Sequence, residues 1–131
     1  MPVWLRFVLL AALLAKDPSR KFSYGSTGPG SFMHVIGEAF KKEAKIDMVH
    51  VPYKGNGPAT VDLLEGQVQL FCIGLMNSLP QMRAGKLRAI GVTGDIRTPL
   101  LPDQPTVQEL GVKDYEYSSW LGLLAPPKTP V

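Results

Sequence analysis

The sequence has few of the residues on which many functional sites depend. Its 131 residues include one cysteine, Cys72, and two histidines, His34 and His50. A single cysteine excludes an intrachain disulfide, and the apolar run around Cys72 predicts a buried side chain that packs as a small hydrophobic group. The histidines have no Cys/His cluster around them, so no metal site is predicted.

Charge of either sign is also sparse and scattered. Charged residues make up 19% of the chain, with 14 basic against 11 acidic side chains and a net charge of +3. No basic run is longer than Lys41-Lys42. Nucleic-acid binders cluster basic residues or interleave them with stacking aromatics, so nucleic acid is not an expected partner. A hydrophobic share of 45% excludes a disordered chain.

No apolar run reaches the length that a membrane-spanning helix needs, about 20 residues. The most apolar stretch is residues 3–15, with Arg6 near its start. Two interpretations are open: a short signal peptide, or an apolar helix over residues 1–17 that ends before Pro18. The helix is favoured, and because it is apolar on all sides, another surface must cover it.

Motifs of nucleotide binding and of catalysis are missing. The glycines at positions 25, 28 and 30 fit neither G-x-G-x-x-G nor G-x-x-x-x-G-K-[ST]. No serine lies in G-x-S-x-G, and no pair of acidic residues is clearly placed at strand ends. We therefore expect a binding module rather than an enzyme, with no cofactor.

Glycine and proline are abundant, with 13 and 12 residues, which predicts many tight connections between short elements. Strands are expected at 21–24, 48–51, 68–73 and 87–92, with a last extended run at 115–124. Helices are expected at 32–44, 58–65, 78–84 and 106–110. The alternation predicts one α/β domain with a mainly parallel sheet flanked by helices.

Two turn-rich loops, which we call the 25–31 loop and the 53–57 loop, form the expected binding site. Ligands of open α/β sheets bind outside the carboxyl ends of the strands, where helix starts offer unpaired N–H groups to anions. The predicted ligand-binding residues are Ser26, Thr27, Gly28, Gly30, Ser31, Tyr53, Lys54, Gly55 and Asn56. The alternative is two ordinary turns with capping serines, a solvated Lys54, and a His34 that bonds to a neighbouring loop.

These residues also carry a resemblance. The stretch Y-G-S-T-G-P-G-S at 24–31, followed by His34, resembles a segment of the Bug family, the substrate-binding proteins of tripartite tricarboxylate transporters. Further segments follow in family order: H-V-P-Y-K-G at 50–55, L-L-E-G-Q-V at 63–68, A-G-K-L-R-A at 84–89, P-D-Q-P-T-V at 102–107 and S-W-L-G at 119–122. The resemblance runs from about residue 16 to the end.

The resemblance implies a type II periplasmic-binding-protein fold with two lobes, of which residues 1–131 resemble the second. It implies a small carboxylate or dicarboxylate held between the lobes, with both loops contributing, and a periplasmic location beside the transporter's membrane subunits. Residues 1–17 then take the place of the helix that opens the second lobe. Residues 115–131 become a strand and tail that cross back to the first lobe.

A lobe without its partner lobe exposes apolar surface, and two hypotheses follow. The chain retains weak carboxylate binding, or it has lost its ligand and acts as a self-associating structural module. We expect a homo-oligomer formed through the apolar helix at 1–17 or the strand at 115–124. The segment at 72–77 departs from the family pattern, so no ligand contact is predicted from it.

Overall fold

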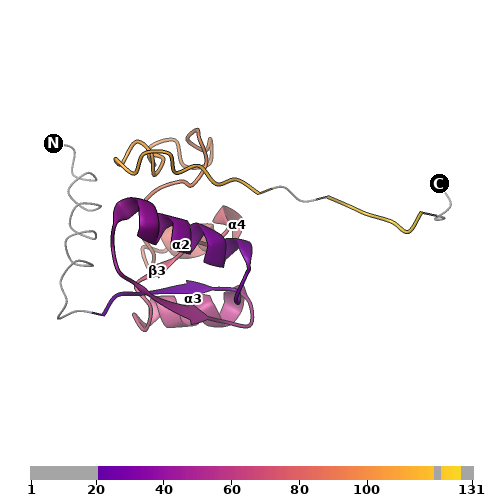
Figure 1. Cartoon of the computed structure of the whole chain (residues 1–131), viewed down its shortest axis with the longest axis horizontal. Coiled ribbons are helices and arrows are strands. Elements are labelled where there is room, and N and C mark those ends of the chain that lie inside the picture. The colour runs from indigo at the N-terminus through magenta and orange to yellow at the C-terminus, as the bar shows by residue number, and fades with distance from the viewer. Residues whose placement is uncertain (1–20, 120–121, 128–131) are drawn as a thin grey trace.

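The computed structural model describes residues 21–119 and 122–127 (Figure 1). The helix expected at 1–17 lies outside these residues. Strands and helices alternate along the described chain as β1 (Ser23–Ser26), α2 (Phe32–Ala44), β2 (Val49–Pro52), α3 (Asn56–Leu64), β3 (Leu70–Phe71) and α4 (Leu75–Arg83).

The three strands form one parallel sheet in the order β2-β1-β3, which confirms the predicted α/β class. The chain passes from β1 through α2 to β2, and then returns through α3 to the other side of β1. Parallel crossovers are right-handed, so this reversal of direction places α2 and α3 on opposite faces of the sheet. Figure 1 shows α2 above the strands and α3 below them.

Helix α2 has the bounds that the sequence predicts. Ser31 caps its first turn, because His34 N donates a hydrogen bond to Ser31 Oγ at 3.2 Å. The helix packs on the sheet through Tyr24, whose side chain is fully buried. Gly37 makes this approach possible, since a Cβ at that position would lie 2.2 Å from a ring carbon of Tyr24.

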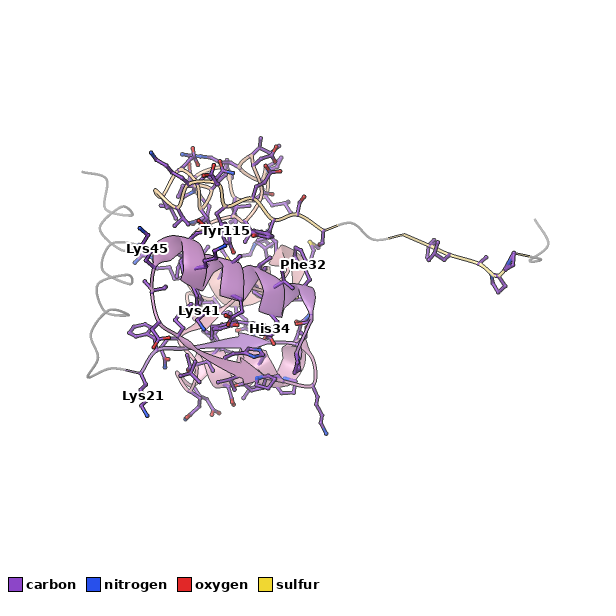
Figure 2. The ribbon with its side chains drawn as sticks, viewed as in Figure 1. Lys21, Phe32, His34, Lys41, Lys45 and Tyr115 are labelled. Atoms are coloured by element: carbon purple, nitrogen blue, oxygen red, sulfur yellow. The ribbon has the colours of Figure 1, made fainter. Side chains whose placement is uncertain are left out.

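The other side of α2 is covered by the irregular segment that follows residue 105, as Figure 1 shows. Val107, Val112 and Tyr115 form a buried cluster there, with Phe40 of α2 packed against it. Tyr115 lies over the helix in Figure 2, and its hydroxyl donates to Ile36 O at 2.9 Å. Both sides of α2 are therefore held, which fixes the position of its amino end.

The second half of the chain has less regular structure than predicted. Residues 87–92 form no strand, and Val92 makes an isolated bridge with Thr106. Residues 106–110 form turns rather than a helix, and the described part of 115–124 is not a strand, although Tyr117 N donates to Thr93 O at 2.8 Å. A strand needs a hydrogen-bonded neighbour along its length. The strand nearest to these residues in the chain, β3, is itself paired with β1 over two residues and is too short to support another strand.

Other boundaries also differ from the prediction: β1 spans Ser23–Ser26 rather than 21–24, and β2 spans Val49–Pro52 rather than 48–51. Helix α3 begins at Asn56 and α4 at Leu75, both earlier than the expected starts at 58 and 78. The expected strand at 68–73 is reduced to β3, which leaves Cys72 between β3 and α4. Cys72 is half-buried, and burial raises the pKa of its thiol to about 11, so it stays protonated and unreactive near neutral pH.

Candidate functional site

The carboxyl ends of β1 and β2 lie side by side, and their loops lead to helices on opposite faces of the sheet. Tyr53 N donates to Ser26 O at 2.9 Å, which joins the 53–57 loop to the 25–31 loop. Adjacent parallel strands that diverge in this way form the crevice at which open α/β sheets bind ligands. The structure thus brings both predicted loops to one edge of the sheet.

The 25–31 loop holds its shape through its own hydrogen bonds. Gly28 and Gly30 have φ of +126° and +76°, values that favour glycine. Gly28 N donates to Ser26 Oγ at 3.1 Å, and Ser31 N donates to Gly28 O at 3.2 Å. Ser31 Oγ then caps α2, which leaves Phe32 N and Met33 N as first-turn donors without an intrahelical acceptor.

Ser26 holds the loop from inside the protein. Its side chain is fully buried, and its Oγ lies 2.6 Å from His50 Nε2 and 3.2 Å from Gly28 O. These partners use the hydroxyl within the protein, so Ser26 shapes the 25–31 loop rather than presenting its own hydroxyl. Thr27 and Ser31, both half-buried, are the hydroxyl residues nearer to solvent.

Beneath the loop, three aromatic rings lie in a stack. The His34 and His50 rings are 4.0 Å apart at 9°, and the His50 and Tyr24 rings are 5.1 Å apart at 28°. His34 points from α2 toward the strands (Figure 2), and its Nδ1 accepts from Gly30 N at 2.9 Å. The interpretation of His34 as a residue that bonds to a neighbouring loop is therefore confirmed.

Glu38 and Lys41 of α2 form an ion pair at the Tyr24 end of the stack. Tyr24 donates its hydroxyl to Glu38 Oε1 at 2.5 Å, and Lys41 Nζ lies 3.2 Å from the same oxygen. The hydrogen bond from Tyr24 holds the pKa of Glu38 below its ordinary value, against the effect of burial. Burial, together with Glu38, raises the pKa of Tyr24. The stack is thus tied to α2 at both ends.

The 53–57 loop is built differently. Tyr53 donates its hydroxyl to Asp62 Oδ2 of α3 at 2.7 Å, and burial followed by this bond raises the pKa of Tyr53 to about 12. Gly55 has φ of +115° and gives α3 no side-chain cap. Asn56 N and Gly57 N are therefore uncapped donors at the start of α3.

Two polar side chains of this loop have different environments. Lys54 is exposed and forms no ion pair with a described residue, which favours its solvated interpretation. Asn56 Oδ1 is buried and has no hydrogen-bond partner among the described residues. A buried amide oxygen without a donor is costly, so Asn56 is the loop residue that an added donor would satisfy.

A cavity of about 1220 Å³ lies between α2, α4 and the irregular second half of the chain, and its lining reaches the first residues of α2, Phe32 and Met33. Its lining is mainly apolar and includes Phe40, Leu70 and Tyr115, but none of the nine predicted site residues. Among residues 21–119 and 122–127, no group of three or more metal-ligating side chains comes together. None of the described helices combines the length and apolarity required to span a bilayer.

Sequence reasoning missed the partners of the two loops. His50, Glu38 and Asp62 each bond to a predicted site residue or to the ring stack, and none was selected from the sequence. A signal existed for His50, which is paired in register with Tyr24 across the sheet. Finding it required the alignment of two strands separated by a whole helix.

Comparison with known proteins places this fold. The chain resembles an R. palustris protein solved with adipate, with a TM-score of 0.88 and 38% identity, over 94% of this chain and 41% of that one. It resembles MatC from Rhodopseudomonas palustris with bound malate, with a TM-score of 0.75 and 30% identity, over 82% of this chain and 36% of that one. It also resembles the periplasmic binding protein BugD, with a TM-score of 0.76 and 35% identity, over 84% of this chain and 37% of that one. The fold is thus that of a lobe of a periplasmic binding protein, as predicted.

The sequence profile of the tripartite tricarboxylate transporter family receptor matches residues 10–131. The UPF0065 protein in the TAR-I ttuE-ttuC' intergenic region of Agrobacterium vitis is 37% identical over 124 residues, covering 95% of this chain and 36% of that protein. The chain belongs to this receptor family, which confirms the resemblance, and it spans about a third of that relative's length. A receptor family also agrees with a binding module rather than an enzyme.

Proposed function

We propose that this chain is a solute-binding lobe that holds a small carboxylate or dicarboxylate at the amino ends of α2 and α3. The observation that carries the proposal is the convergence of two helix starts at one edge of the sheet, joined by the bond from Tyr53 N to Ser26 O. A helix start combines unpaired N–H donors with a partial positive charge, which suits an anion.

Eight of the nine predicted residues then have a part in the site, and Lys54 stays in solvent. Phe32 N and Met33 N from α2, and Asn56 N and Gly57 N from α3, are the backbone donors. Thr27 and Ser31 add hydroxyl groups, while Gly28, Gly30 and Gly55 supply the positive φ that turns each loop. Ser26 and Tyr53 hold the loops in place through buried or shared hydroxyl groups.

The family supports the chemical class of the ligand. Two similar structures were solved with adipate and with malate, both dicarboxylates, and the matched family is one of transporter receptors. We further propose that the protein is located in the periplasm and that membrane transporter subunits are its partners. The ligand's second carboxylate then lies toward the partner lobe, and binding by this lobe alone is weak.

Titration calorimetry with adipate and malate tests the proposal, with the uncharged 1,6-hexanediol as the control solute. Affinity for the two dianions in the millimolar range is expected, and no heat from the diol. Thr27→Ala, which removes a hydroxyl donor of the proposed site, should weaken binding on the order of tenfold, because a charge-assisted hydrogen bond contributes about 1.5–3 kcal/mol. Lys86→Ala, an exposed change outside both loops, should leave the affinity as it is. Equal heats for dianion and diol would refute the proposal.

A second candidate is self-association, supported by apolar side chains left in solvent. Leu123 and Leu124 are 105% and 93% exposed, and Met76 on α4 is 75% exposed. We propose that a second copy of the chain covers the segment around residue 123. Light scattering at micromolar concentration should then show a dimer that Leu123→Ser with Leu124→Ser reduces to a monomer. A monomer from the unaltered chain would exclude it.

A further inference from the structure

The stacked histidines beneath the 25–31 loop have an arrangement that anion binding alone does not require. His34 comes from α2 and His50 from β2, and their rings lie 4.0 Å apart. Each ring directs one nitrogen to the loop, His34 Nδ1 to Gly30 N at 2.9 Å and His50 Nε2 to Ser26 Oγ at 2.6 Å. The pair therefore touches the loop at both of its ends.

The two contacts respond differently to a proton. A backbone N–H is always a donor, so His34 Nδ1 must be unprotonated for the Gly30 bond to exist, which assigns its proton to Nε2. At His50 the partner is a hydroxyl, which can accept as well as donate. Ser26 Oγ lies within hydrogen-bonding distance of both His50 Nε2 and Gly28 O, so when Nε2 carries a proton Ser26 accepts from it and donates to Gly28 O, 3.2 Å away.

We propose that the His34–His50 pair positions the 25–31 loop for the anion, and that protonation of the pair makes the anion affinity fall as the pH falls. The proposal rests on the proposed function and names its regulation. Histidine is the side chain that ordinarily changes charge between about pH 5 and 8. A proton on His34 Nδ1 would set an N–H against Gly30 N–H, and a second charge on His50 would repel the first at 4.0 Å.

The charged and titratable groups around the pair are Tyr24 on β1 and Glu38 and Lys41 on α2. Burial and His34 lower the pKa of His50, Glu38 opposes this, and Lys41 adds to it. The lowered pKa favours a neutral His50 at neutral pH, whose Nε2 accepts from Ser26 Oγ or donates to it according to the tautomer. Glu38 already accepts hydrogen bonds from Tyr24 and Lys41, so it forms no ion pair with a protonated ring of either histidine.

A charge on the pair would also attract an anion, and this opposes the proposed effect. In the proposed site the anion lies on the solvent side of the loop, where a high dielectric weakens this attraction. The lost bond acts at the 2.9 Å contact that sets the shape of the loop. Loss of loop shape therefore outweighs the attraction, and the net effect is weaker binding in acid.

Two substitutions separate the effect of histidine protonation from the effect of side-chain packing. His34→Asn places an amide oxygen where Nδ1 lies, and His50→Gln places one where Nε2 lies, and neither amide titrates. Adipate affinity is measured by calorimetry at pH 7.5 and 5.5 for the full chain and for the double variant. The protonation of adipate itself affects both proteins equally, so the ratio of their affinities isolates the histidines.

The expected result is a double variant within about threefold of the unaltered chain at pH 7.5 and on the order of tenfold tighter at pH 5.5, as one lost hydrogen bond predicts. His34→Ala, which restores no acceptor, should bind more weakly than the double variant at both pH values. A ratio that is the same at both pH values, or an unaltered chain that binds more tightly in acid, would overturn the proposal.

A ligand-free measurement keeps this test separate from the proposed function. The amide resonance of Gly30 should move with the histidine ring protons between pH 8 and 5 in the unaltered chain and stay fixed in His34→Asn. A Gly30 amide that titrates in a protein without affinity for adipate or malate would refute the proposed function and leave the positioning role standing. A Gly30 amide that ignores histidine protonation would refute the positioning role.

Discussion

The two loops at the edge of the sheet reach the same place by different means. The 25–31 loop is fixed by a side-chain cap, by Ser26 within the loop, and by two histidines below it. The 53–57 loop has no side-chain cap, an exposed Lys54 and a buried amide oxygen on Asn56 without a partner. Its firm attachment is the hydroxyl of Tyr53 on Asp62.

The difference teaches how a half-site can be ready for a ligand. The 25–31 loop is preorganised, so its donors lose little freedom on binding. The 53–57 loop retains unmet hydrogen-bonding capacity at the start of α3, which a ligand or a facing surface would satisfy. The 25–31 loop therefore presents donors in a fixed geometry, and the 53–57 loop presents hydrogen-bonding groups that still lack a partner. Four substitutions test how differently the two loops are held.

The largest effect is expected where the support of the 25–31 loop meets α2. Gly37→Ala should lower the free energy of unfolding by about 1–3 kcal/mol, because the new Cβ would collide with the Tyr24 ring that stacks on His50. Gly57→Ala is the matched control on α3, since its Cβ would meet no atom within 4 Å. That change should leave stability unchanged or raise it by up to about 1 kcal/mol. Urea denaturation of both variants decides, and equal midpoints would contradict the comparison.

Removal of the cap should come next. Ser31→Ala should cost about 1 kcal/mol of unfolding free energy, because His34 N at the start of α2 loses its acceptor. Ser119→Ala, at an exposed position, should change stability by less than about 0.5 kcal/mol. If thermal unfolding gave the two variants the same stability, the cap would not be what fixes this loop.

The attachment of the 53–57 loop is open to a smaller test. Tyr53→Phe should cost about 0.5–1.5 kcal/mol, the usual range for one hydrogen bond. The folded pKa of Tyr53 is raised to about 12, so this contribution is complete below the ordinary value of about 10 and is lost as the pH rises through 12. A double-mutant cycle with Asp62→Ala measures the coupling, and a coupling of zero would show that the pair does not hold the loop.

The smallest effect concerns pH and His50. Burial lowers the folded pKa of His50, so the unfolded chain binds more protons in the range just below about 6.5. The free energy of unfolding should therefore decline as the pH falls from 7 to 5, and it should decline less in the His50→Gln variant. The lowered pKa of Glu38 adds a further loss in more acidic solution. Urea midpoints at pH 7, 6 and 5 measure the slopes, and parallel slopes would argue against a half-buried neutral His50.

The sequence predicted the first half of the described chain well. The bounds of α2 and its Ser31 cap were found from apolar spacing and one capping residue, which are local signals. The turns at Gly28, Gly30 and Gly55 followed from residues that tolerate positive φ. The second half failed because its strands needed neighbours: Val92 and Thr106 meet in one bridge, and Tyr117 has one backbone bond to Thr93.

The candidate site divides in the same way. Both loops were chosen from sequence, but the roles within them were not. Ser26 was predicted as a ligand donor, whereas its buried hydroxyl lies against His50, 24 positions away in the chain. That distance depends on the register of two strands, which no local pattern contains.

By itself, the sequence determined the family, the α/β class and the positions of the two loops, because glycine placement, capping residues and helical spacing act over a few residues. The tertiary structure decided what the loops rest on. The parallel pairing of β1 with β2 brought His50 under Ser26 and beside His34, and the close approach of Tyr24 to Gly37 held the stack against α2. Contacts of this kind arise from packing between distant segments, where register and volume rather than local preference determine which atoms meet.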